Sequence, residues 1–274
     1  MKLFVIICIL FFQPSLHGQT QEYFPAFDYT VRDILSNCHV KSVSAMTTKV
    51  DSVIPAAWEK KYRKEFDKDG RITEIMFYSL SGPVNPIRYH YNRDGKLIRK
   101  TTRLDTVTYK YYFDGDLYEE DSWNGIILNR SSYFYNKPNQ IQYIRHSTIR
   151  YDQLDTTGMN KACFYYDKDD RLIHEMHISL RDTTYQCWYK YDGQNNLIEK
   201  RSKWSYLPDT STTKLEYDSK NRIIRWLSLS KTGVPTTIIT WEYDSSGLIM
   251  SRYDEKFTII TSKYKTKYEY EYYK

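Results

Sequence analysis

Hydrophobic and polar residues alternate along most of the chain after Trp58, and one seven-residue pattern interrupts this alternation repeatedly. Tyr91 to Leu97 shows the pattern. An aromatic residue leads, Asp or Asn follows, Gly, Asn or Asp stands at the fifth position, and an aliphatic residue closes the unit. A period of two is typical of β-strands, and a short polar interruption between two such runs predicts a hairpin turn. The chain is therefore expected to fold as a series of antiparallel hairpins.

The unit occurs eight times, and its positions have physical reasons. Asp or Asn at the second position accepts hydrogen bonds from the backbone two residues on, and Tyr112 is the exception. The fifth position holds only Gly, Asn or Asp, the residues that adopt a positive φ at low cost. We therefore predict a type I turn with a β-bulge, which sets the leading aromatic residue opposite the closing aliphatic one. The leading residues are Phe66, Tyr91, Tyr111, Tyr135, Tyr166, Tyr191, Tyr217 and Tyr243.

The strands before the turns separate apolar from charged positions. The residue two before the leading aromatic is usually aromatic as well, as in Tyr89 and Trp241, whereas the residue directly before it is mostly charged. After the turn, the residue that follows the closing aliphatic is again apolar in six copies, which are Ile98, Tyr118, Ile173, Ile198, Ile224 and Met250. Apolar side chains on both faces favour a sheet that curls over itself or is covered on both sides.

Two copies carry a resemblance to a known family. Glu216-Tyr217-Asp218-Ser219-Lys220-Asn221-Arg222-Ile223 and Phe66-Asp67-Lys68-Asp69-Gly70-Arg71-Ile72 resemble the YD repeat, also called the RHS repeat, with the consensus Tyr-Asp-x-x-Gly-Arg-Leu. The resemblance extends from Trp58 to the C-terminus, where Tyr268 to Tyr273 looks like the leading strand of a ninth, truncated repeat. It implies hairpins of one long sheet that winds into a spiral or a hollow shell. Larger members usually add a core region and a toxin segment. Neither is visible here, so the family's delivery role is not carried over.

The first 57 residues do not match the repeat. Residues 1–18 have the charged start, apolar stretch and small final residue of a secretory signal peptide. Leu3 to Phe12 is too short to span a membrane, since a spanning helix needs about 20 apolar residues. Residues 19–57 are expected to form an N-terminal cap over the sheet's open edge, with a short helix over Asp28 to Asn37 and a strand over Val40 to Val53. Residues 58–274 form the repeat domain.

These features predict an all-β fold. We expect an array of about eight antiparallel β-hairpin YD repeats that forms one long curled or spiral sheet, with a small N-terminal cap. We expect a secreted, periplasmic or cell-surface protein without a transmembrane segment after signal removal. The formal net charge of +6 is spread along the chain, without the basic run that nucleic-acid binding needs.

Candidate catalytic groups have simpler explanations. In a strand, His174 and His177 point to opposite faces, which argues against a shared metal ion. Asp169 and Asp170 look like a carboxylate pair, as do Asp114 and Asp116, but turn chemistry explains both pairs. Calcium binding at such turns stays open. We predict no catalytic residue, metal ligand or cofactor.

The three cysteines after the signal segment do not describe a disulfide framework, because their number is odd. They are Cys38, Cys163 and Cys187. Strand alternation also puts Cys163 and Cys187 on opposite faces of the sheet, so we do not expect these two to pair.

Three aromatic residues break the alternation. Phe134, Tyr165 and Trp188 lie one, one and three residues before their turns, where other copies mostly carry charged or small polar residues. Neighbouring repeats would bring them together as a ligand-binding patch, with Lys190 alongside, because aromatic surfaces suit sugar rings and partner side chains. The alternative is that the sheet curls here and the rings fill the inside of the curl.

The functional hypothesis is a non-enzymatic extracytoplasmic binding or scaffold protein that contacts a glycan, another envelope component or a cell-surface protein. Two alternatives stay open. One is a secreted polysaccharide hydrolase that acts through acidic residues at a loop. The other is a shell or accessory protein for a toxin encoded elsewhere.

Overall fold

The computed structural model describes residues 35, 37–50, 57–79, 81–150, 153–179, 182–257 and 261–273. These residues form nineteen strands and no long helix. The strands are β1 (Val40–Lys49), β2 (Glu59–Phe66), β3 (Ile72–Ser79), β4 (Gly82–Pro83), β5 (Ile87–Tyr91), β6 (Leu97–Thr101), β7 (Thr106–Tyr111), β8 (Leu117–Trp123), β9 (Ile127–Lys137), β10 (Gln140–Arg150), β11 (Gln153–Tyr166), β12 (Leu172–Ser179), β13 (Asp182–Tyr191), β14 (Leu197–Trp204), β15 (Thr210–Tyr217), β16 (Ile223–Leu229), β17 (Pro235–Tyr243), β18 (Ile249–Lys256) and β19 (Ser262–Tyr272). No helix among the described residues is long and apolar enough to cross a membrane.

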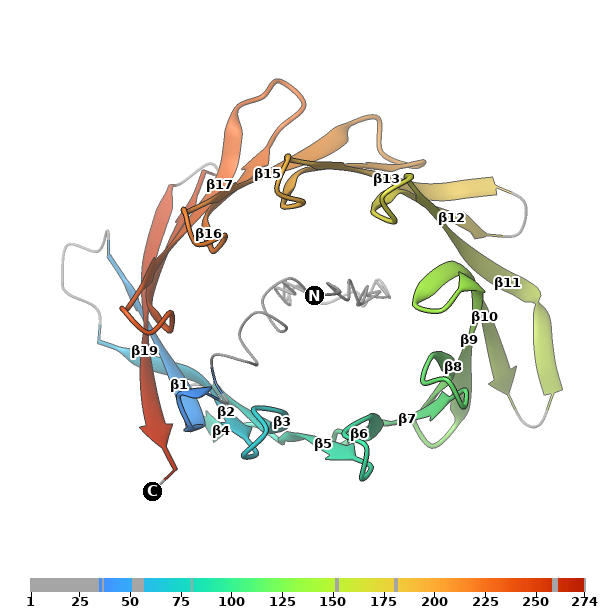
Figure 1. Cartoon of the computed structure of the whole chain (residues 1–274), viewed down its shortest axis with the longest axis horizontal. Coiled ribbons are helices and arrows are strands. Elements are labelled where there is room, and N and C mark those ends of the chain that lie inside the picture. The colour runs from blue at the N-terminus through green and yellow to red at the C-terminus, as the bar shows by residue number, and fades with distance from the viewer. Residues whose placement is uncertain are drawn as a thin grey trace.

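Neighbouring strands pair in chain order, and the first strand pairs with the last, so the sheet closes into a barrel (Figure 1). Val43 of β1 lies opposite Tyr270 of β19 on one side and Lys64 of β2 on the other. The two-residue β4 pairs only with the end of β3, and the other eighteen described strands form the ring. The predicted all-β antiparallel fold is confirmed, but the curled or spiral sheet is wrong. Closure gives each of these eighteen strands two neighbours and leaves the ring without an edge strand.

The N-terminal region contributes a wall strand. The expected strand after Val40 exists as β1, but it fills the seam of the ring between β2 and β19 and does not lie over an open edge as a cap. The signal segment lies outside the described residues, as does nearly all of the expected helix over Asp28 to Asn37, of which only Leu35 and Asn37 are described, both helical. Leu35 is buried and packs in one cluster with Phe66 and Leu248.

The predicted turns form as expected. In the first unit Gly70 N donates to the carbonyl of Asp67 over 3.0 Å, and the Asp67 side chain accepts hydrogen bonds from the backbone of Asp69 and Arg71. The fifth residue has a positive φ in all eight units, between 59° at Asn221 and 105° at Gly115. Pairing registers shift by one residue directly before most turns, which is the predicted bulge.

The leading tyrosines also join each repeat to the one before it. The hydroxyl of Tyr91 donates to the backbone carbonyl of Ile72, the closing residue of the preceding unit, over 2.9 Å. The same bond recurs around the wall at 2.7 to 2.9 Å from Tyr111, Tyr135, Tyr166, Tyr191, Tyr217, Tyr243 and Tyr270. Tyr270 therefore occupies the leading position of the expected ninth, truncated repeat. These bonds hold neighbouring hairpins together close to their turns, where the ladders between repeats have stopped.

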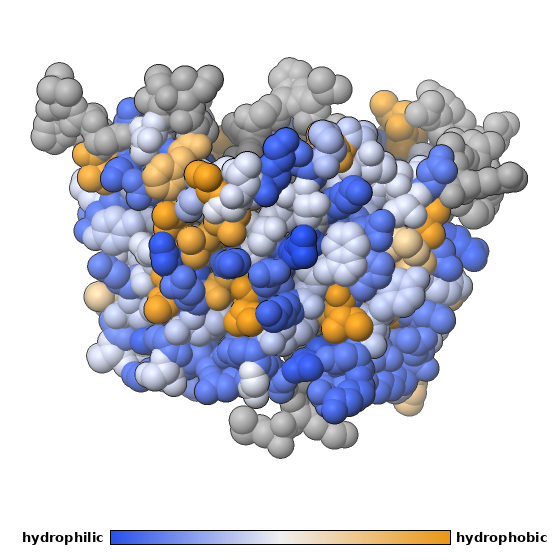
Figure 2. All heavy atoms as spheres, turned by 90° about the horizontal axis from the view of Figure 1, so that it is seen from above, coloured by the Kyte–Doolittle hydropathy of each residue, from blue (hydrophilic) through white to orange (hydrophobic). Residues whose placement is uncertain are grey.

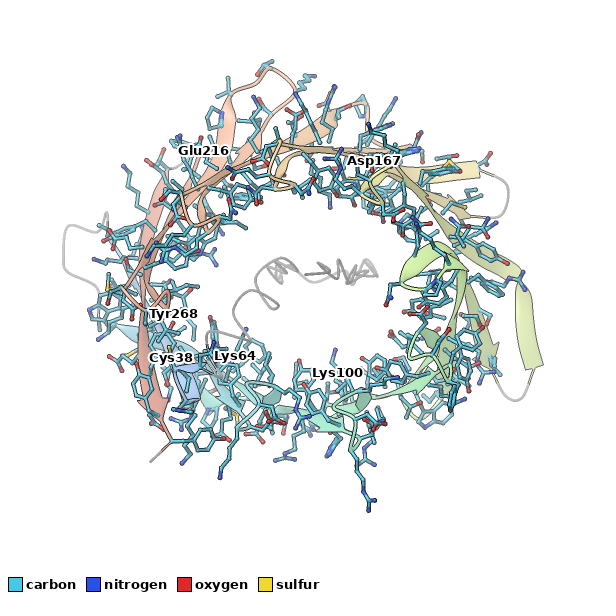
Figure 3. All side chains as sticks on the ribbon, viewed as in Figure 1. Cys38, Lys64, Lys100, Asp167, Glu216 and Tyr268 are labelled. Atoms are coloured by element: carbon cyan, nitrogen blue, oxygen red, sulfur yellow. The ribbon has the colours of Figure 1, made fainter. Side chains whose placement is uncertain are left out.

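The inner face carries the apolar layer. Tyr133, Ile144 and Phe164 are buried in its largest cluster. Figure 3 shows Lys64, Lys100 and Tyr268 pointing into the ring and Glu216 pointing away from it. The residues after the closing aliphatics occupy the bulges on the outside, where Ile98, Ile173 and Met250 are exposed. The inference of a sheet covered on both faces is therefore wrong, because the bulge turns these side chains out of the layer that the alternation predicts.

The outer face is mostly charged. Arg130 of β9 donates to Asp121 of β8 over 2.8 Å, and Arg88 of β5 donates to Glu74 of β3 over 2.9 Å. Figure 2 shows one side of this wall as hydrophilic, with small separate groups of apolar residues. Charges that are paired across neighbouring strands stay hydrated there at little cost.

Candidate functional site

Phe134, Tyr165 and Trp188 all lie on the outer face of the barrel. Tyr165 and Trp188 are 45% and 39% exposed, and Phe134 is partly exposed. The alternative expectation, that these rings fill the inside of the sheet, is wrong. Tyr165 pairs with His174, whereas its neighbour Phe164 pairs with Glu175 and is buried in the inner layer. Strand alternation therefore sends Tyr165 outward.

The three rings belong to two stacks. Phe134 of β9 stacks on Tyr143 of β10, with centroids 4.3 Å apart and planes 17° apart. Tyr165 of β11 stacks on His174 of β12 at 5.3 Å, and the other face of His174 meets Trp188 of β13 at 5.2 Å. Sequence reasoning missed Tyr143 and considered His174 only as a metal ligand. Both stand two residues after the closing aliphatic of their unit, directly across from the outward residue before the turn.

Most of these ring faces are already occupied. His174 has an aromatic ring on both sides, and Tyr143 has Phe134 on one side and the ammonium of Lys161 4.0 Å from its centroid. Arg145 lies 5.5 Å from the centroid of Phe134. Among the described residues, Tyr165 has a ring contact only with His174 on its β12 side, and it lines a groove on the side of β10. The face of Tyr165 toward the groove is thus the open aromatic surface of the site.

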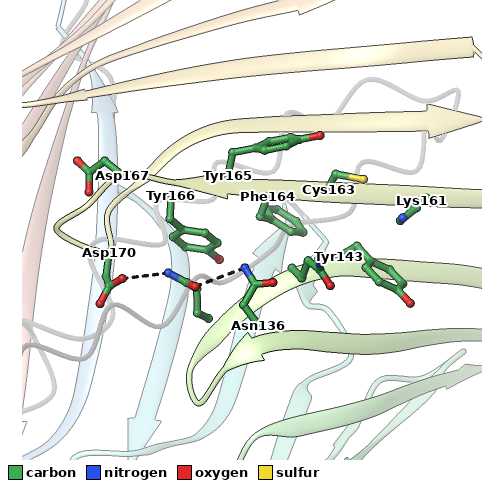
Figure 4. A pocket seen from close by; sticks show the side chains of 11 residues that line it. Asn136, Tyr143, Lys161, Cys163, Phe164, Tyr165, Tyr166, Asp167 and Asp170 are labelled. Carbon is green, nitrogen blue, oxygen red and sulfur yellow. Dashed lines mark hydrogen bonds between the residues drawn. The ribbon is translucent and has the colours of Figure 1, made fainter.

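The groove lies between β10 and β11 and has a volume of about 500 Å³ (Figure 4). The ladder between these strands stops at the pair Tyr143 and Cys163, and toward the turns the hydroxyl of Tyr166 spans the opening to the carbonyl of Ile141. Tyr143, Lys161, Gln142 and Tyr165 line the groove together with Asn136, Gln140, Asp167 and Asp170. The groove thus combines aromatic rings with amides, carboxylates and one ammonium group.

The polar end of the groove is a hydrogen-bonded chain between two turns. Asp170 Oδ1 accepts from Lys137 Nζ at 2.5 Å and from Gln140 Nε2 at 3.2 Å, and Gln140 Oε1 accepts from Asn136 (Figure 4). A hydrogen bond from the Arg171 backbone and the Arg171 guanidinium lower the pKa of Asp167, so this carboxylate stays ionised at neutral pH. Asp169 meets Arg171 at 3.4 Å. Asp167 and Asp169 are thus held within their own turn, as the sequence predicts, whereas the carboxylate of Asp170 bonds to the neighbouring turn.

His174 and His177 point to opposite faces, as predicted. His177 is on the inner face, where Nε2 lies 2.5 Å from Glu175, and Tyr189 donates to the other oxygen of Glu175. Burial alone raises the pKa of Glu175, but the bonds from His177 and Tyr189 outweigh burial and lower it. Among the described residues no group of three or more His, Cys, Asp and Glu side chains could hold a metal ion.

The cysteines also follow the predicted faces. Cys163 lies on the outer face beside the groove, and Cys187 is buried on the inner face. All three described cysteines are free thiols.

Comparisons with known proteins give no family. No family model matches the sequence, and no curated protein matches it. The barrel is similar to a porin-like protein from Bacteroides uniformis ATCC 8492, with a TM-score of 0.46 and 11% identity over 85% of this chain and 98% of that one. It is also similar to a porin-like protein from Bacteroides vulgatus ATCC 8482, with a TM-score of 0.37 and 13% identity over 75% of this chain and 98% of that one. The comparison with TcdB2-TccC3 without its hypervariable C-terminal region gives a TM-score of 0.28 and 9% identity over 77% of this chain and 15% of that one. Similarities this weak assign neither a family nor a function.

Proposed function

We propose that this chain is a non-enzymatic extracytoplasmic binding protein, a short secreted relative of the YD-repeat proteins, which holds a glycan against its outer wall. The binding site is the groove between β10 and β11, and a sugar ring stacks on the open face of Tyr165. One observation carries the proposal: this open aromatic face borders a groove lined by amides, carboxylates and Lys161.

The chemistry of the groove suits a sugar. The C–H groups of a pyranose ring pack on an aromatic face, while its hydroxyls need donors and acceptors placed around that face. Gln142 is exposed beside the groove and offers both a donor and an acceptor. His174 and Trp188 support Tyr165 from behind, so that its ring is held upright before a ligand arrives. Such preorganisation reduces the entropy that binding costs.

The outer wall supports an aqueous location within the envelope or outside the cell. A charged side chain that faces lipid at the bilayer midplane costs about 2–4 kcal/mol in a membrane barrel. Here arginines such as Arg130, Arg145 and Arg201 lie in the middle of their strands on the outer wall. We therefore place the wall in water, with the signal segment directing export.

A glycan-binding screen of the mature protein tests the proposal. Tyr165→Ala should weaken binding of the selected glycan about two- to tenfold, because one aromatic contact is worth about 0.5–1.5 kcal/mol. Trp188→Ala should weaken it less, since Trp188 acts through His174. Tyr112→Ala is the matched control: Tyr112 is similarly exposed and makes a tilted ring contact with Tyr118, with centroids 5.0 Å apart, but it lies in another turn. A glycan that binds the wild type and the Tyr165 variant equally would overturn the assignment of the site.

The hydrolase and the toxin shell stay alternatives with less support. Asp169 and Asp170 are held in turn contacts, so the proposal gives them no catalytic part. Glycan turnover that disappears in Asp170→Asn, at unchanged stability, would favour the hydrolase instead.

A further inference from the structure

The two ends of the barrel differ in chemistry. Turns within the repeats lie at one end, which we call the turn end, and the loops between repeats lie at the other, which we call the loop end (Figure 1). Tips at the turn end consist mainly of charged, amide, Gly and Ser residues, with the exposed Tyr112 and Phe113 of one turn as the main apolar exceptions. Figure 2 shows one end of the barrel as almost entirely hydrophilic.

The loop end carries exposed apolar side chains around the ring. Four are aromatic, namely Trp58, Trp123, Tyr206 and Phe257. Six are aliphatic, namely Val50, Val84, Leu104, Ile126, Leu207 and Val234. Leu104 is 75% exposed and Tyr206 71%, so these side chains project from the loops, and the Tyr206 ring contacts Trp204 at the end of β14 with centroids 5.6 Å apart. Every loop end with described side chains at its tip supplies at least one of them.

We propose that the loop end docks on the surface of a lipid bilayer, with these apolar tips inserted among the headgroups and the barrel axis standing upright on the membrane. Trp and Tyr prefer the membrane interface, because their rings are apolar and their N–H or O–H stays hydrated. Peripheral proteins bind there through buried apolar area without crossing the membrane. The charged outer wall then stays in water above the headgroups.

The arrangement of the tips favours a bilayer over a second copy of the chain. A stable protein interface needs a continuous, well-packed centre that excludes water. The described side chains of this ring do not meet across its middle (Figure 3), and the apolar residues stand on separate loops. Lipid accepts each tip independently, so a ring of separate tips is sufficient for it.

The charges at the loop end indicate which lipid to test. Lys231 and Asp209 lie on neighbouring tips and meet at 3.2 Å, and Arg103 and Asp105 lie within one loop. Both described pairs combine a positive with a negative charge, so these tips offer little net charge to attract anionic lipid. We expect docking on a neutral, zwitterionic surface.

Flotation of the mature protein with phosphatidylcholine vesicles tests the proposal. The wild type should float with the vesicles. A variant with Leu104→Ser, Ile126→Ser, Tyr206→Ser and Val234→Ser should bind about tenfold less, because apolar area drives interfacial binding. The matched control, with Tyr112→Ser, Ile98→Ser, Ile173→Ser and Met250→Ser, removes four exposed apolar side chains near the turn end and should float like the wild type.

Two further readings keep the test decisive. Vesicles that contain brominated phosphatidylcholine should quench the fluorescence of Trp123 in otherwise unaltered protein, with Trp123→Phe as the reference. A wild type that neither floats nor is quenched overturns the proposal. Sedimentation velocity tests the alternative that a second copy of the chain binds at the loop end. A dimer that only the loop-end variant disrupts, without vesicle binding, shows that the loop end joins two copies and also overturns it.

Discussion

The hydroxyl of Tyr273 donates a 2.5 Å hydrogen bond to the backbone carbonyl of Phe66, 207 residues earlier in the chain. The backbone N–H of Tyr273 also donates to the carbonyl of His39 over 2.8 Å. Phe66 leads the first repeat and, as a phenylalanine, has no hydroxyl of its own to give. At the seam, the end of the chain thus supplies a tyrosine bond of the kind that joins neighbouring repeats elsewhere in the wall.

Tyr273→Phe should lower the free energy of unfolding by about 1 kcal/mol, because one hydrogen bond is lost while the ring is kept. Chemical denaturation measures the change. Tyr272→Phe is the control, since Tyr272 is exposed in the neighbouring position and bonds to no carbonyl in the ring of tyrosine bonds. Equal losses in the two variants would show that the seam bond contributes nothing of its own.

Gly95→Val should destabilise the protein by about 1 kcal/mol or more, since a β-branched residue is strained at positive φ. Gly95 has a φ of 77°, and a Cβ there would lie 2.8 Å from Nη1 of Arg71 in the preceding turn. Gly193→Val serves as the comparison, because nothing lies within 4 Å of its Cβ position and its φ is not positive. Thermal unfolding should show the larger shift for Gly95→Val, and the reverse order would contradict the turn geometry.

Gly247→Asn should stabilise the protein by about 0.5–1 kcal/mol, because it provides a hydrogen-bond acceptor to a buried donor. Arg171 Nη1 donates over 3.0 Å to Asn195, the fifth residue of the next unit. Arg222 holds the same position as Arg171, but the fifth residue of its next unit is Gly247, and its Nη1 is buried without a partner among the described residues. Gly247→Ala should destabilise the protein, since Ala is strained at the positive φ of this position and adds no hydrogen-bond acceptor. Stabilisation by both changes would rule out the hydrogen bond as the cause.

Stability should fall as the pH drops from about 6.5 to about 4, partly through His146. Burial, with a smaller contribution from His177, lowers the pKa of His146 from 6.5 to about 4, although Nδ1 stays 3.0 Å from the hydroxyl of Ser131. Above pH 6.5 this histidine is neutral in both states and contributes no pH dependence. Between 6.5 and 4 only the unfolded state binds the proton, which costs the fold about 1.4 kcal/mol per pH unit.

His146→Gln removes that titration, so its unfolding free energy should depend less on pH in this window. Denaturation at pH 7, 6, 5 and 4 compares the two proteins. If the unfolding free energy of the variant and the wild type changed equally with pH, His146 would be excluded as a source of the pH dependence.

The local structure was predictable because the residues of each turn unit determine its conformation through short-range contacts. Asp67, Gly70 and their counterparts determine the turns through contacts within five residues, and the alternation assigns the faces of Tyr165 and Trp188. Closure was not predictable in this way. It depends on Val43 meeting Tyr270, two residues 227 positions apart, and on the total twist and tilt of all the strands between them.

The site was predictable in part. Sequence reasoning found Phe134, Tyr165 and Trp188 but left open which face they occupy, and on the strands after the turns it considered only the residue next to the closing aliphatic. Tyr143 and His174 lie on those strands and separate the three rings into two stacks. The groove depends on where the ladder between β10 and β11 stops. That position is set by the pairing of the two strands and could not be predicted from any single residue.

A closed ring changes size only in whole steps. Adding or removing one hairpin, which is two strands, keeps the seam strands β1 and β19 antiparallel. A single added strand would reverse the direction of β19 and make it parallel to β1. The width of the interior is therefore a discrete variable, and relatives with more or fewer repeats would form a graded series of rings, each able to enclose a different cross-section.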